Sequence, residues 1–451
     1  MKKLNSLIRD GSITNSIMGL NRLMFRYSRS IDYEVTGYNA AKAIIQNMSR
    51  AMSYSAIMGG FCLSISQNTF ATSTADDTFR PYIGTTLTYD SNLLRLADVI
   101  TPEQAAGKNT KSDFIKRIRG GIDIDWRISR QQILAKLEVN QNWFQTFSEL
   151  DYLGHTVEGQ WNWQIGSDLN GVIRYSNNVS VGSFGQLNQL VKNIMTLEQY
   201  GATGAYQIFP SWFLRAGVLR NNILFSEELL KISNLQENTG DFGVRYVSPG
   251  NNMLGLRMLL TEGSFLNRRV SARVDNAYRR TSYQMEWNWN YSVKTQVDGY
   301  IGYTQQKFDH LNSLDFADFI GRANINWQIT GKTMLNLSGW REIGQANDIN
   351  ATFVQRHGLL LKPSWLTTPK ITLELPISYE QQDYLGDSGF SPNKPAQARV
   401  DKLSRIGMNL IYKPLENTKV SLFIQHEERK STNLRSNYES QSAGINMQVA
   451  F

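Results

Sequence analysis

The feature that most constrains this chain is an alternation of apolar and polar residues with a period of two, which dominates the sequence from Phe79 onward. Residues 122–128 read IDIDWRI, residues 157–165 read VEGQWNWQI and residues 319–327 read FIGRANINW. Because successive side chains of a β-strand point to opposite faces, each such segment has one apolar and one polar face. The pattern therefore predicts an all-β fold built from amphipathic strands.

The organisation of the connections separates a membrane barrel from a soluble sandwich, whose strands also alternate. Short turns are expected near residues 129–130, 167–168, 210–211, 249–250, 292–294, 331–332, 368–369 and 414–417. Longer polar connections lie between them and include residues 90–112, 222–239, 265–277, 386–398 and 429–437. Short turns at one rim and long loops at the other are typical of outer-membrane barrels. We therefore predict a transmembrane antiparallel up-and-down β-barrel of about 18 strands, with 16 as the alternative and both termini periplasmic.

Composition excludes a bundle of membrane-spanning helices. Charged residues make up 19% of the chain, and its mean hydropathy of −0.37 is typical of a soluble protein. No stretch beyond Ala71 offers the roughly 20 consecutive apolar residues that a spanning helix needs. A barrel escapes this limit because only alternate residues of each strand face lipid.

An export signal is expected before the first strand. The apolar run 51–66 follows Arg50 and precedes a stretch of small residues, which matches the order of a basic region, an apolar region and a cleavage site. We assign residues 48–75 to a signal peptide, with cleavage after Ala71 or Ala75. A retained membrane anchor is the alternative, although the run is short for a span.

The segment before this signal is much longer than an ordinary basic region. Residues 1–47 form an upstream extension to which the sequence assigns no function, and either Met48 or Met52 is a candidate for the true start. The barrel is expected to occupy residues 76–451. Cys62, the single cysteine, lies in the segment expected to be removed, which excludes disulfides and cysteine-ligated zinc from the mature chain.

The net charge of +8 does not indicate nucleic-acid binding. Residues 1–71 carry eight Lys and Arg against three Asp and Glu, which leaves 39 basic and 36 acidic residues in the rest of the chain. Nucleic-acid recognition needs a concentrated basic face, and this nearly balanced remainder does not provide one.

The chain also lacks the motifs of an enzyme. The four histidines fall on different expected elements, outside any recognised nucleophile or metal motif: His155, His310, His357 and His426. Asp123 and Asp125 share a polar strand face next to Arg127, so ion pairs in the wall explain them more simply than acid–base catalysis. We expect no catalytic activity, no cofactor and no metal site.

Aromatic placement supports the barrel. Seven tryptophans lie within a few residues of the expected short turns and predict an interfacial girdle: Trp126, Trp163, Trp212, Trp287, Trp289, Trp327 and Trp365. Residues 442–451 alternate up to the terminal Phe451. A closing strand that ends on an aromatic residue resembles the signal read by the barrel assembly machinery.

The same registers turn a set of arginines toward the lumen: Arg117, Arg119, Arg127, Arg174, Arg215, Arg245, Arg257, Arg322 and Arg405. An arginine facing lipid at mid-membrane costs about 2 to 4 kcal/mol, which supports this assignment of faces. Two interpretations remain open. The arginines pair with Asp and Glu across the wall, or they form a basic, amide-rich conduit that weakly holds ions, sugars or acidic polymers at successive sites.

The first strand carries a family resemblance. Residues 80–84 read RPYIG and residues 89–96 read YDSNLLRL. This opening resembles the EpsL-type outer-membrane barrels associated with exopolysaccharide biosynthesis, a group of β-barrel porins in which R-P-Y-x-G precedes Y-D-x-N-L-x-R-L. Beyond this motif, the likeness covers the mature chain only in length, strand rhythm and the terminal Phe451.

The resemblance implies an integral protein of the Gram-negative outer membrane, surrounded by lipid. Its implied function is to export a polysaccharide, either neutral or anionic, together with periplasmic export components. It transfers no catalytic residue. The alternative from the same architecture is a general porin for small solutes. In such a porin a long loop folds inward and narrows the pore, and the candidate loops here are 90–112 and 222–239. A structural or adhesive barrel without transport is the second alternative.

Overall fold

The computed structural model describes residues 78–182, 184–186, 189–271, 274–345, 351, 353–386 and 398–451. The expected upstream extension 1–47 and the expected signal peptide 48–75, with both cleavage positions, lie outside the described residues.

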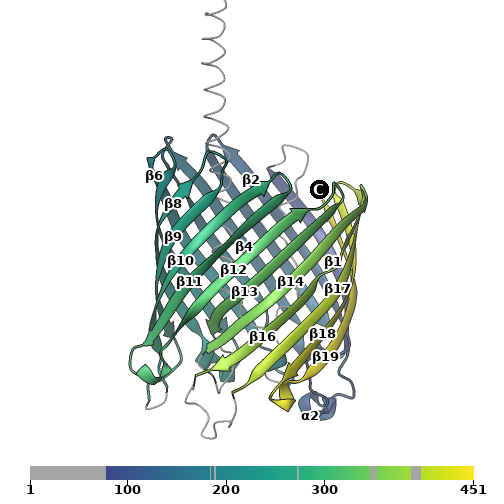
Figure 1. The fold of residues 1–451 in the computed structure, drawn as a ribbon. Helices are drawn as coiled ribbons and strands as arrows, with labels where there is room; N and C mark the ends of the chain where they lie inside the picture. Colours follow the sequence, from purple (N-terminus) through teal and green to yellow (C-terminus); the bar gives the residue numbers. More distant parts are fainter. Residues whose placement is uncertain are drawn as a thin grey trace, which may run out of the picture.

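The described residues form one antiparallel sheet that closes on itself into a barrel (Figure 1). Its first nine strands are β1 Phe79–Asp90, β2 Asp113–Ile128, β3 Gln131–Phe144, β4 Tyr152–Ile165, β5 Leu169–Val181, β6 Ile194–Phe209, β7 Trp212–Phe225, β8 Leu235–Val247 and β9 Met253–Phe265. The others are β10 Ala277–Ser292, β11 Thr295–Phe308, β12 Phe316–Gln328, β13 Thr333–Gln345, β14 Phe353–Thr368, β15 Ile371–Glu374, β16 Ile377–Leu385, β17 Val400–Leu415, β18 Thr418–Ser431 and β19 Tyr438–Ala450.

Strands β15 and β16 are two pieces of one strand, because both pair with β14 on one side and β17 on the other. Pro376 lies between them and has no backbone N–H to donate to the ladder. The barrel therefore has 18 strands around its circumference, and the pairing of β1 with β19 closes it. This confirms the prediction of 18 strands over the alternative of 16.

The connections alternate between the two rims as predicted. Each expected short turn joins a pair of described strands, and the longer connections lie at the opposite rim. The long connections carry α2 Pro102–Ala106 and the 3-10 turns η1 Ser148–Leu150, η2 Phe184–Gln186, η3 Glu228–Ser233, η4 Asn312–Leu314 and η5 Leu434–Ser436. Both ends of the described barrel lie at the short-turn rim (Figure 1). That this rim faces the periplasm stays a prediction.

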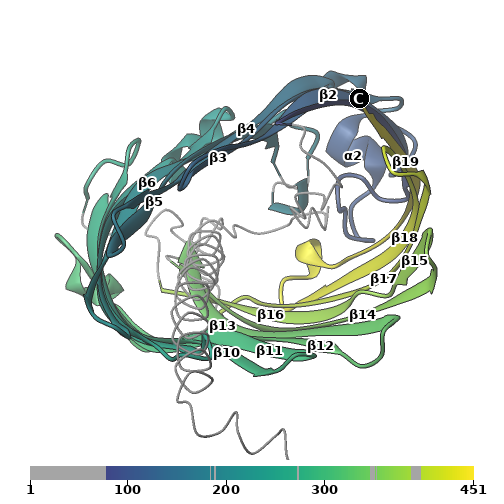
Figure 2. The same ribbon diagram turned by 90° about the horizontal axis from the view of Figure 1, so that it is seen from above.

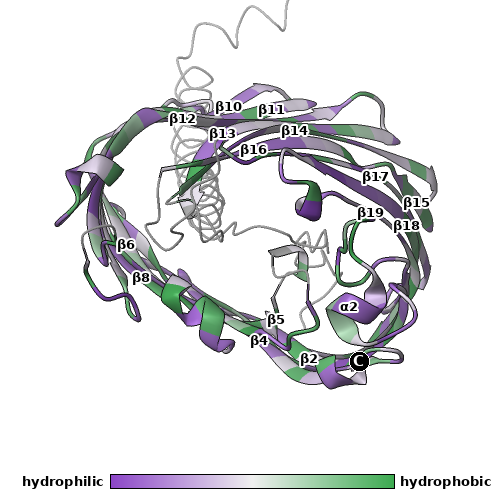
Figure 3. Ribbon diagram, turned by 90° about the horizontal axis from the view of Figure 1, so that it is seen from below, coloured by the Kyte–Doolittle hydropathy of each residue, from purple (hydrophilic) through white to green (hydrophobic). Residues whose placement is uncertain are grey.

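The outer face of the barrel is apolar. Val218, Leu256 and Phe319 are 64%, 66% and 63% exposed, although they lie within their strands. Polar neighbours alternate with such residues along the strands, and Figure 3 shows hydrophilic and hydrophobic segments mixed around the barrel wall. An apolar band of this extent on a closed barrel is the surface that a lipid bilayer covers.

The expected tryptophan girdle lies on this outer face near the short-turn rim. Trp126, Trp212, Trp289, Trp327 and Trp365 are exposed there. The other two pack over glycines of the neighbouring strand, Trp163 on Gly171 and Trp287 on Gly299, where an added Cβ would meet the indole.

The connection between β1 and β2 folds over the opening of the barrel. Figure 2 shows α2 inside the barrel outline. Leu94 and Leu96 of this connection are fully buried in an apolar cluster with Phe147. Arg95 donates from Nη1 to Asp90 at 2.9 Å and from Nε to Glu427 of β18 at 3.2 Å. Of the two loops expected to fold inward, residues 91–112 therefore narrow the long-loop end of the lumen.

Candidate solute site in the barrel lumen

All nine predicted arginines lie on the strand face opposite the exposed apolar residues, so they belong to the inner wall. Their depth differs along the barrel. Arg215 and Arg245 have only 2% of their side chains exposed, whereas Arg127 at the short-turn rim has 62% exposed. Arg127 therefore faces water at the rim and does not contact the central lumen.

Seven of the nine arginines form ion pairs with carboxylates of the wall. The pairs are Arg117–Glu138 at 3.0 Å, Arg127–Asp125 at 3.4 Å, Arg215–Asp241 at 2.6 Å, Arg245–Glu286 at 3.1 Å, Arg257–Asp241 at 2.8 Å, Arg322–Glu342 at 2.8 Å and Arg405–Glu427. The other two donate to side-chain amides: Arg119 to Gln448 at 2.8 Å, and Arg174 to Gln160. The inner wall is therefore polar and largely charge-compensated rather than uniformly basic.

A five-membered ionic cluster joins strands β7 to β10. Asp241 accepts from Nε and Nη2 of Arg257 at 2.8 and 2.9 Å, and its Oδ2 lies 2.6 Å from Nη2 of Arg215. Glu286 lies 3.1 Å from Arg245 and 3.7 Å from Arg215. Because two carboxylates lie among three arginines, each buried charge faces an opposite one, which offsets its desolvation.

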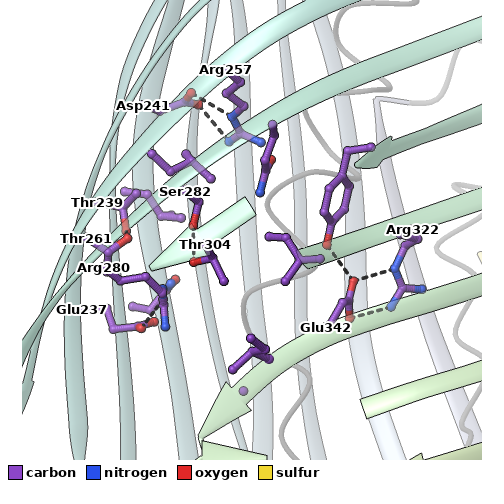
Figure 4. A pocket seen from close by; sticks show the side chains of 18 of the residues that line it. Glu237, Thr239, Asp241, Arg257, Thr261, Arg280, Ser282, Thr304, Arg322 and Glu342 are labelled. Atoms are coloured by element: carbon purple, nitrogen blue, oxygen red, sulfur yellow. Dashed lines mark hydrogen bonds and ion pairs between the residues drawn. The ribbon is translucent and has the colours of Figure 1, made fainter. Parts of the chain in front are cut away.

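A cavity of about 220 Å³ includes Asp241, Arg257 and Glu286 of this cluster in its lining, where residues of β6 to β14 converge. Hydroxyl pairs cross its wall: Thr239 with Thr261 at 2.8 Å, and Ser282 with Thr304 at 2.7 Å (Figure 4). Each pair bridges adjacent strands because the two residues face each other on the inner side of the sheet.

On the β12 and β13 side, Glu342 is the centre of a second ionic group of the cavity. It accepts from Nε and Nη2 of Arg322 at 2.8 and 2.9 Å and from the Tyr300 hydroxyl at 2.9 Å. The Arg322 guanidinium lies 5.2 Å from the Trp340 ring centroid, and the Trp340 indole donates to Glu380 at 3.0 Å. These contacts hold the guanidinium and the carboxylate in fixed orientations.

The third ionic group lies toward the long-loop end. Glu237 accepts from Arg280 at 2.6 Å and from the Tyr278 hydroxyl at 2.7 Å. Tyr278 packs between the rings of Phe265 and Phe308, with centroids 5.9 and 5.7 Å away. An apolar aromatic cluster therefore backs the polar wall at this end of the cavity.

Sequence reasoning found Arg257 and Arg322 of this cavity and missed their partners. Glu237, Asp241, Glu286 and Glu342 occupy inward positions of the same alternation, so their face was readable from the sequence. Their pairing was not, because it depends on which strands lie side by side and in which register. Trp340 faces inward, unlike the girdle tryptophans, and its own strand carries the signal, because it alternates in step with Asn336, Ser338 and Glu342.

Within the described ranges, no cluster of three or more His, Cys, Asp or Glu side chains is arranged to hold a metal ion. No helix in the described part of the chain is long and apolar enough to cross a membrane.

A closed 18-strand antiparallel barrel with an apolar exterior and a charged, hydroxyl-rich interior defines an integral outer-membrane protein. Comparison of the sequence with protein families supports this class: residues 258–451 match the family described as "Putative beta-barrel porin 2". The chain thus resembles porins over the part of the barrel from β9 to β19.

The chain is also similar to several solved outer-membrane proteins. The protein OpdK from Pseudomonas aeruginosa is 11% identical, with 83% of this chain and 99% of that chain covered and a TM-score of 0.43. OccK2 (OpdF) from the same organism is 8% identical, with 83% and 98% covered and a TM-score of 0.45. The siderophore receptor PirA, also from this organism, is 8% identical, with 84% and 81% covered and a TM-score of 0.40. No curated protein matches the chain.

Proposed function

We propose that this protein is a general porin, a passive channel through which small hydrophilic solutes cross the outer membrane. The observation that carries the proposal is the inner wall: ion pairs, hydroxyls and amides line a closed barrel whose exterior is apolar. Such a wall hydrates a pore and does not bind any one ion tightly, because most of its charges are compensated locally. The match of residues 258–451 to a porin family supports the same function.

The inward-folded connection 91–112 fits this function. It rests on the barrel wall through Arg95, which lies between Asp90 and Glu427 with 12% of its side chain exposed. A loop held in this way restricts the size of solutes that enter. Gly185 of the β5–β6 connection lies at the same end of the lumen, where its carbonyl accepts from Arg429 at 2.8 Å. We therefore expect a pore that excludes polymers and admits small solutes.

Export of exopolysaccharide, which the opening motif implied, has no support from the comparisons, and the porin is the better fit. A polymer exporter needs an unobstructed lumen, whereas the connection 91–112 lies within the barrel outline (Figure 2). A structural barrel without transport would also satisfy the fold, and only a measurement of conduction distinguishes it from a channel.

The test is reconstitution of the purified barrel into planar lipid bilayers and into liposomes. A general porin gives stepwise conductance that grows with salt concentration, and it lets small sugars swell the liposomes at rates that fall with solute size. A barrel that inserts, as judged by its heat-modifiable mobility, and gives neither conductance nor swelling refutes the proposal and favours the structural barrel.

A further inference from the structure

We propose that the lumen cavity lined by β6 to β14 is a binding site for a neutral, hydroxyl-rich solute of about monosaccharide size. The inference rests on the proposed porin function and adds to it the class of solute that the channel retains in transit. Three properties of the cavity support it: its charge balance, its hydrogen-bonding groups and its size.

The charges of the cavity are nearly balanced and mutually satisfied. Four arginines and five carboxylates line it, and three of the arginines, Arg257, Arg280 and Arg322, hold carboxylates at 2.6 to 2.9 Å. A charged solute would have to break one of these pairs or enter without a partner of opposite charge, and both are costly because the paired side chains are largely buried. The cavity therefore selects against anions and cations alike.

The remaining polar groups suit a polyol. Hydroxyls of Thr239, Thr261, Ser282 and Thr304 and the amides of Gln284 and Asn324 line the same space. A hydroxyl both donates and accepts, as does each hydroxyl of a sugar, so the two can exchange hydrogen bonds in either direction. A site built in this way discriminates strongly against solutes that lack matching hydroxyls.

The size and the apolar part of the cavity fit a sugar ring. A volume of about 220 Å³ is below the range of roughly 300 to 1,000 Å³ that drug-sized ligands occupy, so the occupant is small. Phe265, Tyr278 and Tyr300 add aromatic surface to the lining. A sugar presents apolar C–H faces between its hydroxyls, and a mixed lining complements both kinds of surface.

The experiment compares D-glucose with gluconate, which has the same number of carbon atoms and one negative charge. Binding to the folded barrel in detergent is measured by saturation-transfer NMR, which does not require conduction. Brief current interruptions are measured in planar bilayers. We expect glucose to give saturable signals in both assays at millimolar concentrations and gluconate to give neither.

Two variants locate the site. Tyr300→Phe keeps the ring and removes a hydroxyl that donates to Glu342 and can accept from the solute. Loss of that one bond to the solute should weaken glucose binding about fivefold. Glu342→Gln leaves Arg322 without its carboxylate and should allow gluconate to bind. The control is Thr156→Val on β4, whose hydroxyl accepts from Asn178 outside the cavity lining and should leave glucose binding unchanged.

The outcomes separate the two proposals. Conductance without a glucose signal in either assay overturns the solute site and leaves the porin standing. A glucose signal by NMR that Tyr300→Phe weakens, in a barrel that does not conduct, supports the site and overturns the porin. Equal binding of glucose and gluconate to the unmodified barrel, or equal weakening by Thr156→Val and Tyr300→Phe, overturns the inference.

Discussion

The ionic cluster of β7 to β10 gives the sharpest test of how the inner wall is held together. Asp241 lies between Arg215 and Arg257, whose side chains are 2% and 11% exposed, and its own is 5% exposed. The substitution Asp241→Asn keeps the size of the side chain and removes its charge. Glu286 then remains as the single carboxylate of the cluster among three arginines.

Removing one partner from a buried ion pair costs about 3 to 5 kcal/mol, because the remaining charge stays buried without compensation. We expect a value near the lower limit, about 3 kcal/mol, since the asparagine oxygen still accepts one hydrogen bond. Asp125→Asn is the matched control. Its partner Arg127 is 62% exposed at a distance of 3.4 Å, and an exposed pair contributes only about 0 to 1 kcal/mol.

The assay is reversible urea unfolding of the barrel in phospholipid vesicles, followed by tryptophan fluorescence and by electrophoretic mobility of unheated samples. The quantity compared is the free energy of unfolding of each variant relative to the unmodified barrel. An Asp241→Asn barrel that is destabilised no more than the Asp125→Asn barrel would refute the reasoning, because the cluster would then contribute no more than a surface pair.

Four further expectations follow from the same structure. Ile301→Arg places a charge on the lipid face at the middle of β11 and should destabilise the barrel by about 2 to 4 kcal/mol, whereas Ile329→Arg near a short turn should cost about 0 to 1 kcal/mol. Equal urea midpoints for the two variants would contradict the placement of Ile301 at mid-membrane and Ile329 at the interface. Arg119→Gln removes one positive charge from the inner wall, so it should leave assembly intact and shift the reversal potential in a salt gradient toward cation selectivity. Burial raises the pKa of Asp275 in the β9–β10 connection, but hydrogen bonds from His310 and from backbone N–H groups outweigh burial, so the pKa is lowered. The carboxylate therefore stabilises this connection fully above the unfolded pKa of about 3.9, and the stabilisation is lost as the pH falls through the lower folded value. Because the Leu311 amide donates to Asp275, its hydrogen exchange should speed up below about pH 4, beyond its intrinsic pH dependence. Phe451→Asp should reduce the amount of heat-modifiable barrel in the outer membrane while export to the periplasm continues, and normal levels would exclude an assembly role for this residue.

The sequence by itself determined the local and periodic features of the protein. Alternation along residues 122–128 and 319–327 depends only on the geometry of a strand, so it identified the lipid face and the inner face without knowledge of any partner strand. Turn residues mark chain reversals locally, which is why the short turns and the number of strands were predictable. The girdle tryptophans were predictable because their distance from a turn sets their depth in the membrane.

Only the tertiary structure decided which inward groups meet. Asp241 pairs with Arg257 because β8 and β9 are neighbours in one particular register, and Glu342 meets Tyr300 across the intervening strand β12. The connection 91–112 lies over the lumen because Arg95 reaches Glu427, more than 300 residues away in the sequence. Contacts of this kind depend on closure of the barrel, and no local pattern encodes closure. The apolar face of each strand is a property of that strand alone, whereas the charge balance of the lumen arises only when all the strands are assembled.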